Sequence, residues 1–487
     1  MRFAMFCLAL LGLGLAGLLT HWMALACLVI LAYRPVLNLG WTAFLPLIPI
    51  MIHPEVEGDS IMYNLPLALR TLYYHSINLA VDNSISQWMH QAELILCIAP
   101  EYGRVINGLA IAGCAVLLWD MLVRAGVGRL AWMAPVIVLT AHSTYHIAGS
   151  SKMDAWTMFF SFLSAWYFMR GRIFHSGLAV GLAAACKLTA GPLALGLLIF
   201  GGSRMAVAAG AGLVLVPWMV REYLVVGNPI FPAMGNAFTE TFWPALRKRQ
   251  YAEEVSRGKN LGTMITTLFL MSPASAFCVS GASQARMRRM VFIGVIGAVG
   301  VFWNMTLNPR YLLPVLPWLA VPSMVAVHRW LYGPALCGAY AFLAVFCTVG
   351  GYIKAVNQDP IPKTYLAAME ACEGKRVLSW GEERKYPKGS PRNVMWSYLG
   401  QPLMWKLAKE STGSSRMVVK ARQMGVTHIL VNPYSLKTQE IFSGPFLWRQ
   451  TQAQRYFDFV IRYLFPVWIS AADTAGAYIL YSIGGKP

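Results

Sequence analysis

The feature that most constrains this chain is a long succession of apolar segments, separated by short loops, that fills about the first 350 residues. Several segments are shorter than the roughly 20 residues that a helix needs to cross a bilayer, so tilted, broken or re-entrant helices are expected. The pattern predicts a polytopic α-helical membrane protein with about 11–13 transmembrane helices. The segments lie approximately at 3–19, 22–33, 38–52, 105–123, 131–148, 155–170, 174–188, 190–202, 205–220, 261–281, 290–306, 312–327 and 332–352.

Composition agrees with a membrane protein and argues against a nucleic-acid partner. Hydrophobic residues make up 57% of the chain and charged residues only 13%, about half of the ~25% that is usual in globular proteins. The net charge of +19 would indicate nucleic acid in a soluble protein. Here many basic residues fall in short loops, where they orient membrane helices or hold anionic lipid phosphates, and no RNA- or DNA-binding motif is present.

Loop charge predicts the orientation of the chain. With the N-terminus in the cytoplasm and a retained first helix, most arginine-rich loops fall on the cytoplasmic side, as the positive-inside rule requires. The opposite side then receives the loops at about 53–103 and 221–259 and the chain from about 354. The arginines expected inside are Arg2, Arg34, Arg124, Arg129, Arg170, Arg172, Arg204, Arg286, Arg288, Arg289 and Arg329.

The chain becomes much more polar near residue 354. Apolar runs at RVLSWG, THILVN and AYILYSI predict strands, and KTYLAAMEAC and RMVVKARQMG predict helices. We therefore expect a membrane domain, 1–353, with an outer loop at 53–103, and a small α/β domain, 354–487, outside the membrane. In the outer loop, LPLALRTLYYHSINLAV and NSISQWMHQAELILCIA predict helices that lie on the membrane surface or pack within the loop.

Charged residues recur at the outer ends of successive apolar segments, where charge is costly and therefore indicates function. If the helices bundle, these ends converge on one cavity that holds carboxylates and cations. A carboxylate there could accept a proton from a hydroxyl, and cations could hold a phosphate. The residues are Asp59, preceded by Glu57, with Lys152, Asp154, Lys187, Arg221, Glu222 and Arg310.

Each of these residues also has a structural interpretation, which the sequence leaves open. Asp154 could cap a helix, and Lys187 could cap one or reach to the membrane interface. Arg221 and Glu222 could form a local ion pair, and Arg310 could position a turn between prolines. The acidic stretch around Asp59 could be a solvated loop.

Five stretches carry a resemblance to a known superfamily: EGDSIMYNLPLA, SSKMDAWTMFFSFLSAWYF, AAACKLTAGPLALGLLI, PWMVREYLVVGNPIFPAMG and NPRYLLPVLPWLA. In this order they span most of 55–325, and the chain resembles the GT-C superfamily of lipid-dependent glycosyltransferases. It is most similar to the bacterial branch with protein O-mannosyltransferase-like and aminoarabinose-transferase-like enzymes. One departure is that three apolar segments, not one, precede the first carboxylate.

The resemblance implies roles for particular residues. Asp59 is the expected general base, and Asp154 is expected to orient the acceptor or donor, or to bind a metal where one is used. Basic positions of the family pattern match Lys187, Arg221 and Arg310 as phosphate ligands. Tyr63 and Tyr311 could line the pocket, and Glu57 and Lys152 complete the candidate substrate-binding residues.

The resemblance also implies a polyprenyl-phosphate-linked sugar as donor and a hydroxyl of a lipid, glycan or protein as acceptor. It places the protein in a bacterial inner membrane, with the C-terminal domain in the periplasm. No cofactor is certain and a divalent metal stays open, although HSTYH lacks the Glu that would complete a metal motif. The alternatives are an oligosaccharide ligase or polymerase, a transporter or flippase, and a non-catalytic scaffold that would not need Asp59.

Overall fold

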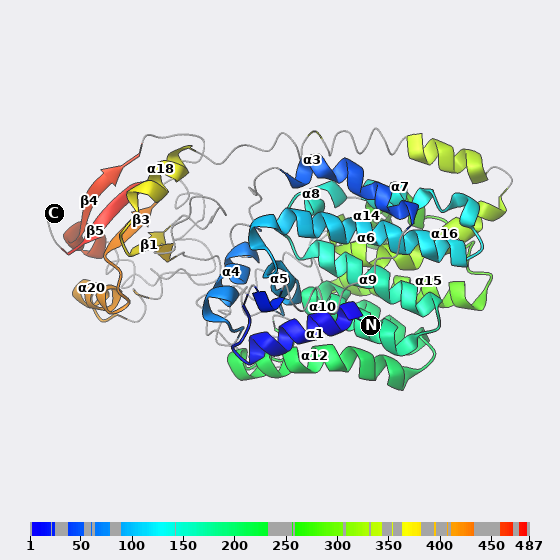
Figure 1. Ribbon diagram of the computed structural model, residues 1–487, viewed down its shortest axis with the longest axis horizontal. Coiled ribbons are helices and arrows are strands. Elements are labelled where there is room, and N and C mark those ends of the chain that lie inside the picture. The colour runs from blue at the N-terminus through cyan, green and yellow to red at the C-terminus, as the bar shows by residue number, and fades with distance from the viewer. Residues whose placement is uncertain are drawn as a thin grey trace.

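The computed structural model describes residues 2–20, 22–24, 38–52, 60, 64–77, 89–141, 143–231, 256, 259–304, 308–330, 333–342, 353, 363–380, 394–395, 407, 411–432, 458–470 and 477–484. Up to residue 342 the described elements form a bundle of long helices, and after residue 363 they form a small mixed sheet with helices (Figure 1). The chain is therefore a polytopic helical membrane protein with a small C-terminal α/β region, as the sequence predicts.

The bundle is built from α-helices and short 3₁₀ helices (η), most of which follow one another after short turns. Its elements are α1 (Arg2–Leu15), η1 (Leu39–Leu47), α3 (Ile48–Met51), α4 (Leu65–Tyr74), α5 (Gln91–Leu96), η4 (Pro100–Tyr102), α6 (Gly103–Arg124), η5 (Gly128–Leu130), α7 (Met133–Thr140), α8 (Thr144–Ala148), α9 (Asp154–Met169), α10 (Ile173–Cys186), η6 (Leu188–Ala190), α11 (Gly191–Phe200), α12 (Arg204–Val226), α14 (Leu261–Met271), η7 (Pro273–Ser275), α15 (Ala285–Asn304), η8 (Pro309–Val315) and α16 (Leu316–Arg329).

Three described helical stretches are long and apolar enough to cross a membrane. They are Pro100–Arg124, Arg204–Val226 and Pro309–Arg329, of 25, 23 and 21 residues. Other apolar helices are shorter, among them Ile173–Cys186 and Leu188–Phe200. Breaks in the helices therefore accompany several of the short apolar segments, as their lengths predict.

Small residues let the central helices approach closely. In α10, Gly177 and Gly181 are four residues apart and face α12, where a Cβ on Gly177 would come within 2.6 Å of the Val207 carbonyl oxygen. A Cβ on Gly181 would come within 2.9 Å of the Ala211 Cα. This spacing of small residues is typical of membrane helices, whose association depends on close packing rather than on the hydrophobic effect.

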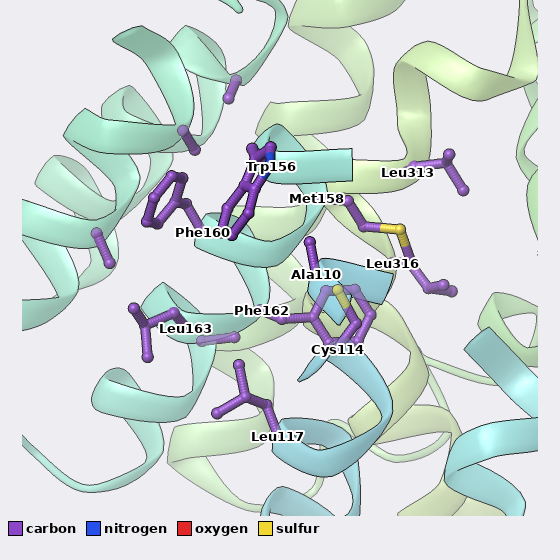
Figure 2. Packing of buried hydrophobic residues seen from close by; sticks show 14 of the residues in the cluster. Ala110, Cys114, Leu117, Trp156, Met158, Phe160, Phe162, Leu163, Leu313 and Leu316 are labelled. Carbon is purple, nitrogen blue, oxygen red and sulfur yellow. The ribbon is translucent and has the colours of Figure 1, made fainter. Parts of the chain in front are cut away.

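Large apolar side chains fill the space between α6, α9 and η8–α16. Figure 2 shows Phe162 of α9 next to Cys114 of α6, while Phe160 of α9 points to the opposite side. Trp156 and Phe160 pack as rings whose centres are 5.9 Å apart. This continuous core holds the helix ends in fixed positions relative to one another.

The C-terminal region folds around a five-stranded sheet in the order β2-β1-β3-β5-β4. Strand β1 is parallel to β2 and β3, while β5 is antiparallel to β3 and β4. Helices α18 and α20 contribute buried residues to two separate clusters with the sheet. The elements are α18 (Lys363–Ala371), β1 (Val377–Trp380), β2 (Val394–Met395), α20 (Ser414–Gln423), β3 (His428–Val431), β4 (Leu464–Ile469) and β5 (Ile479–Ile483).

Side chains of β3 alternate between the two clusters. Ile429 and Val431 pack with α20, while Leu430 packs with α18, as the period of two in a strand requires. The three predicted strands and both predicted helices of this region are confirmed. Its boundary with the membrane domain, near residue 354, lies outside the described residues and stays a prediction.

The first helix of the outer loop is shorter than its sequence pattern predicts. The pattern extends to Val81, but α4 ends at Tyr74 because His75 adopts a left-handed backbone with φ of 57°. Two hydrogen bonds join His75 to Leu19, one of them from the Leu19 N–H to the His75 carbonyl at 3.1 Å and one at the imidazole Nδ1. A contact with a distant segment therefore ends the helix, and the local spacing of apolar residues cannot predict such a contact.

Candidate active site

Five side chains gather where α9 begins, α10 ends and η8 begins. We call them the Asp154 cluster: Asp154, Lys187, Arg310, Tyr311 and Lys152. All five are residues that the sequence predicts for the site. The structure brings them together because α9 and α10 are joined by a short turn and η8 packs on α9, so that their outer ends share one end of the bundle (Figure 1).

A buried ion pair is the centre of this cluster. Lys187 donates from Nζ to Asp154 Oδ1 at 2.7 Å, and the two side chains are only 14% and 6% exposed. Lys187 reaches Asp154 because the chain leaves helical geometry there, with an extended φ of −158° after α10 ends at Cys186. The desolvation cost of such a pair tends to cancel its attraction, so its presence argues more for function than for stability.

Tyr311 holds two cations side by side. Its phenol oxygen accepts a hydrogen bond from Arg310 Nη2 at 3.1 Å, and the Lys187 ammonium lies 4.5 Å from the centre of its ring. The Arg310 backbone is set by Asn308, whose side chain accepts from the Arg310 N–H at 3.1 Å. The π face of the tyrosine attracts a cation without neutralising it, so both positive charges are retained.

The loop that leads into α9 is fixed by hydrogen bonds from two other segments. Asn107 of α6 donates from Nδ2 to the carbonyls of Ser150 at 2.7 Å and Lys152 at 2.8 Å. The Ser151 N–H donates to the Ser60 hydroxyl at 3.0 Å. All of these residues are buried. The loop therefore has one path, and it ties Ser60, which directly follows Asp59 in the sequence, to the segment that carries Lys152.

Lys152 contacts a histidine, and this contact argues against a metal at that point. The Lys152 ammonium can only donate, so it donates to His146 Nε2, 3.2 Å away. Within the ranges that the structure describes, no group of three or more His, Cys, Asp and Glu side chains could hold a metal ion. Because cations contact both His146 and Asp154, the described residues do not fit a divalent-ion site.

Glu93 of α5 is a further carboxylate near the cluster, which the sequence interpretation missed. It is 2% exposed, and the charges of Lys187 and Asp154 both act on it. Burial raises the pKa of Glu93 to about 8, its backbone hydrogen bond and Lys187 oppose the shift, and Asp154 adds to it. The sequence signal was one acidic residue within the apolar run QAELIL.

Arg221 has structural partners of its own. Its Nη1 donates to Glu222 Oε1 at 2.5 Å and its Nη2 donates to the Ile77 carbonyl at 2.9 Å. Both charged side chains are almost fully buried, at 2% and 0% exposed. These contacts favour the ion-pair interpretation that the sequence left open, and a phosphate-binding role for Arg221 stays a prediction.

Three predicted site residues, Asp59, Glu57 and Tyr63, lie outside the described residues. Their roles stay predictions, and the geometry of the site is that of the Asp154 cluster and its supports. His142, the second histidine of HSTYH, lies outside the described residues as well.

Comparison with known proteins identifies the fold. The chain matches no protein-family model and no curated protein sequence. It is similar to the crystal structure of ArnT from Cupriavidus metallidurans bound to undecaprenyl phosphate, with a TM-score of 0.59 and 12% identity over 92% of this chain and 98% of that one. The apo structure of the same ArnT gives a TM-score of 0.56 at 11% identity, with the same coverage. This chain has the fold of that ArnT.

Within this fold, the Asp154 cluster offers one buried and two partly buried positive charges at one end of the helical bundle. Lys152, Lys187 and Arg310 all stabilise the charge of Asp154, so three cations surround one ion-paired carboxylate. Such a group suits an anion that enters and leaves, because buried cations attract phosphate strongly where water is scarce.

Proposed function

We propose that this protein is an integral-membrane glycosyltransferase that transfers a sugar from a polyprenyl-phosphate carrier to a hydroxyl of a lipid, glycan or protein. The observation that carries the proposal is the Asp154 cluster, in which three cations surround one buried carboxylate at one end of a GT-C bundle. The ArnT of similar fold binds undecaprenyl phosphate. A lipid phosphate here would have its charge met by Lys187 and Arg310 while its chain lay among apolar helices.

In the proposed reaction the acceptor hydroxyl gives its proton to Asp59 and its oxygen attacks the anomeric carbon of the sugar. The bond from that carbon to the phosphate oxygen breaks, and its electrons leave with polyprenyl phosphate. The sugar is transferred with inversion. Lys187 and Arg310 stabilise the growing negative charge on the phosphate, which is where fixed cations accelerate a reaction most.

The remaining residues support this step. Asp154 holds Lys187 in place through the 2.7 Å ion pair and is available to orient the acceptor or donor. Lys152 and Tyr311 line the same region, and the sequence offers Glu57, Tyr63 and Arg221 as further substrate-binding candidates. Loop charge supports an orientation with this end of the bundle and the C-terminal domain outside the cytoplasm. The family resemblance implies a bacterial inner membrane, in which that side is the periplasm.

Two other functions compete with this one. A ligase or polymerase would use similar groups to move a whole oligosaccharide, and donor length separates the two activities. A transporter or flippase is expected to place charged groups near the middle of the bilayer. The described charges instead gather at helix ends, which favours the enzyme.

The test is release of free polyprenyl phosphate by purified protein incubated with a panel of polyprenyl-phosphate sugars and membrane extract as acceptor. We expect release with at least one donor, and loss of release in Asp59→Asn with folding and membrane insertion intact. Asp82→Asn, the same change in the same predicted loop, should retain activity. Full activity of Asp59→Asn would remove the base from the mechanism, and no release with any donor would overturn the proposed enzyme.

A further inference from the structure

Glu93 is a buried acid in which one carboxylate oxygen has no hydrogen-bond partner within the part of the chain that the structure describes. Its Oε2 is fully buried and finds no partner among the described residues, although a buried carboxylate oxygen usually does. Asp154 and Glu222, also buried, have cationic partners at 2.7 and 2.5 Å. Glu222 Oε2 also lacks a partner among the described residues, so Glu93 differs from these two acids in having no ion pair with a described cation.

The fold places Glu93 beside the proposed phosphate site. Its helix, α5, packs against α10, which ends at Lys187, and against α1 and α4. The charges that act on Glu93 are those of Lys187 and Asp154, so it lies within electrostatic reach of the central ion pair. Its protonation therefore changes the net charge that an anion at Lys187 encounters.

The other titratable groups around Glu93 leave it as the adjustable one. From α10 and from its own segment it faces the thiols of Cys186 and Cys97, which are buried and uncharged, and Cys7 of α1 faces Cys186 in turn. The described side chains of α4 include no titratable group. On α12, Arg221 and Glu222 are bound to each other. His90, at the start of α5, packs against Trp218 with ring centres 4.8 Å apart.

Charge counting shows what a proton on Glu93 would do. Lys187, Arg310 and Lys152 carry three positive charges, and Asp154 carries one negative charge. With Glu93 protonated this set has a net charge of +2, and with Glu93 ionised it has +1. The donor is a phosphodiester with one negative charge, whereas the released phosphate monoester carries about −1.5 to −2 at pH 7. The product phosphate is therefore more negative than the donor, and the site must bind this product and still release it.

We propose that Glu93 is a positioning residue that balances the charge of the phosphate site through Lys187: it carries a proton while polyprenyl phosphate is bound and gives that proton to solvent as the phosphate leaves. This inference rests on the proposed function. It assigns Glu93 to product binding and release rather than to the bond-making step, which belongs to Asp59.

The sign of the pH dependence follows from linkage. A bound phosphate favours the neutral form of Glu93, so binding takes up a proton wherever Glu93 is ionised in the free protein. Because the pKa of Glu93 in the free protein is about 8, affinity for polyprenyl phosphate should fall as pH rises through 8. The phosphate itself does not contribute, since its second pKa is about 6.

The experiment measures undecaprenyl phosphate binding to the full-length protein in detergent by calorimetry, in two buffers of different ionisation enthalpy. At pH 8 the wild type should take up roughly half a proton per phosphate, and its affinity should fall about tenfold between pH 7.5 and pH 9. In Glu93→Gln the proton uptake and the pH dependence should be lost, with affinity held near the low-pH value. A role in packing alone would not change proton uptake in this way.

Two further variants sharpen the test. Glu101→Gln makes the same change at an exposed residue of the same predicted loop, and it should leave both quantities at wild-type values. Glu93→Asp keeps a carboxyl group and should keep the proton uptake. Wild-type binding that is independent of pH and takes up no proton would overturn the inference and leave the proposed function standing. No binding of undecaprenyl phosphate to the wild type at any pH would overturn both.

Discussion

The two ends of the helical bundle each carry a carboxylate surrounded by cations and aromatic rings, yet they differ in exposure and in hydrogen bonding. At the end opposite the Asp154 cluster, the Asp120 carboxylate accepts from Arg124 and Trp166 at 2.7 Å and from Arg170 at 3.2 Å. We call these four residues the Asp120 cluster. Asp120 is 21% exposed and Arg124 is 44% exposed, whereas the Asp154 carboxylate is 6% exposed and has one bonded cation.

This difference in exposure and hydrogen bonding indicates that the two clusters have different roles. At the Asp120 cluster, water shares the solvation of the charges and one carboxylate oxygen accepts three hydrogen bonds, as expected for residues that orient and anchor helices at an interface. At the Asp154 cluster, three cations that are buried or partly buried surround one buried carboxylate, and withdrawing them from water costs stability. Charges that break the rules of stable packing are expected at functional sites.

The largest effect is expected from Lys187→Met, which keeps much of the side-chain volume and removes the charge. Asp154 loses its 2.7 Å partner, and breaking a buried pair from one side costs about 3–5 kcal/mol of folding free energy. Sugar transfer should fall at least about 100-fold, because one preorganised charge on the leaving phosphate is lost. Donor turnover and thermal unfolding in detergent measure the two effects.

Donor and acceptor affinities separate this role of Lys187 from a purely structural one. Donor KM should rise much more than acceptor KM in the folded fraction of Lys187→Met. Equal changes in both, or activity within twofold of wild type, would remove Lys187 from the phosphate site and leave the two clusters alike.

Arg221→Lys should affect stability more than catalysis. Lysine keeps the positive charge beside Glu222 but loses the planar fork that also reaches the Ile77 carbonyl, at 2.9 Å from Nη2. A lost charge-assisted hydrogen bond of this kind costs about 1.5–3 kcal/mol. The unfolding temperature should fall while donor KM stays within about twofold. If donor KM rises tenfold with the unfolding temperature unchanged, Arg221 belongs with the phosphate ligands.

Tyr311→Phe tests the pairing of cations on one ring. The ring face remains for Lys187, but the hydrogen bond from Arg310 to the phenol oxygen, 3.1 Å long, is lost. Arg310 then orients less well, and donor KM should rise about tenfold, the equivalent of one charge-assisted hydrogen bond. Tyr340→Phe is the matched control, because its hydroxyl pairs with the neutral Thr140 at 2.7 Å. Steady-state kinetics with equal losses in both variants would argue against a special role for Tyr311.

The sequence predicted the Asp154 cluster because a charge at the end of an apolar segment is conspicuous. Lys152, Asp154, Lys187 and Arg310 all stand out in this way. The sequence could not show which charged side chains already have a partner. Arg221 looked equivalent to Lys187 in the sequence, but in the fold it binds both the Glu222 carboxylate and the Ile77 carbonyl. Contacts between distant segments decide which of several similar charges is engaged.

Glu93 was missed for a related physical reason. Its helix has six residues, too few to reveal a periodic face. Its importance comes from neighbours such as Lys187 and Asp154, which lie at the end of α10 and at the start of α9. The strands of the C-terminal region were predicted more reliably, because their apolar runs stand in polar surroundings and alternate between two buried faces.

The smallest effect is expected from Arg124→Met, which repeats the Lys187→Met change at the Asp120 cluster. Asp120 would keep its hydrogen bonds from Trp166 and Arg170, and water can replace the half-exposed guanidinium. A solvent-exposed ion pair of this kind contributes about 0.2–1 kcal/mol, so the unfolding temperature should change little and donor turnover should stay near wild type. A large loss of activity here would mean that buried charge does not separate the two ends, and that the Asp120 cluster also takes part in the reaction. A silent Arg124→Met beside an inactive Lys187→Met would instead show that function follows the burial of charge, because the two variants remove the same kind of partner from the same kind of carboxylate.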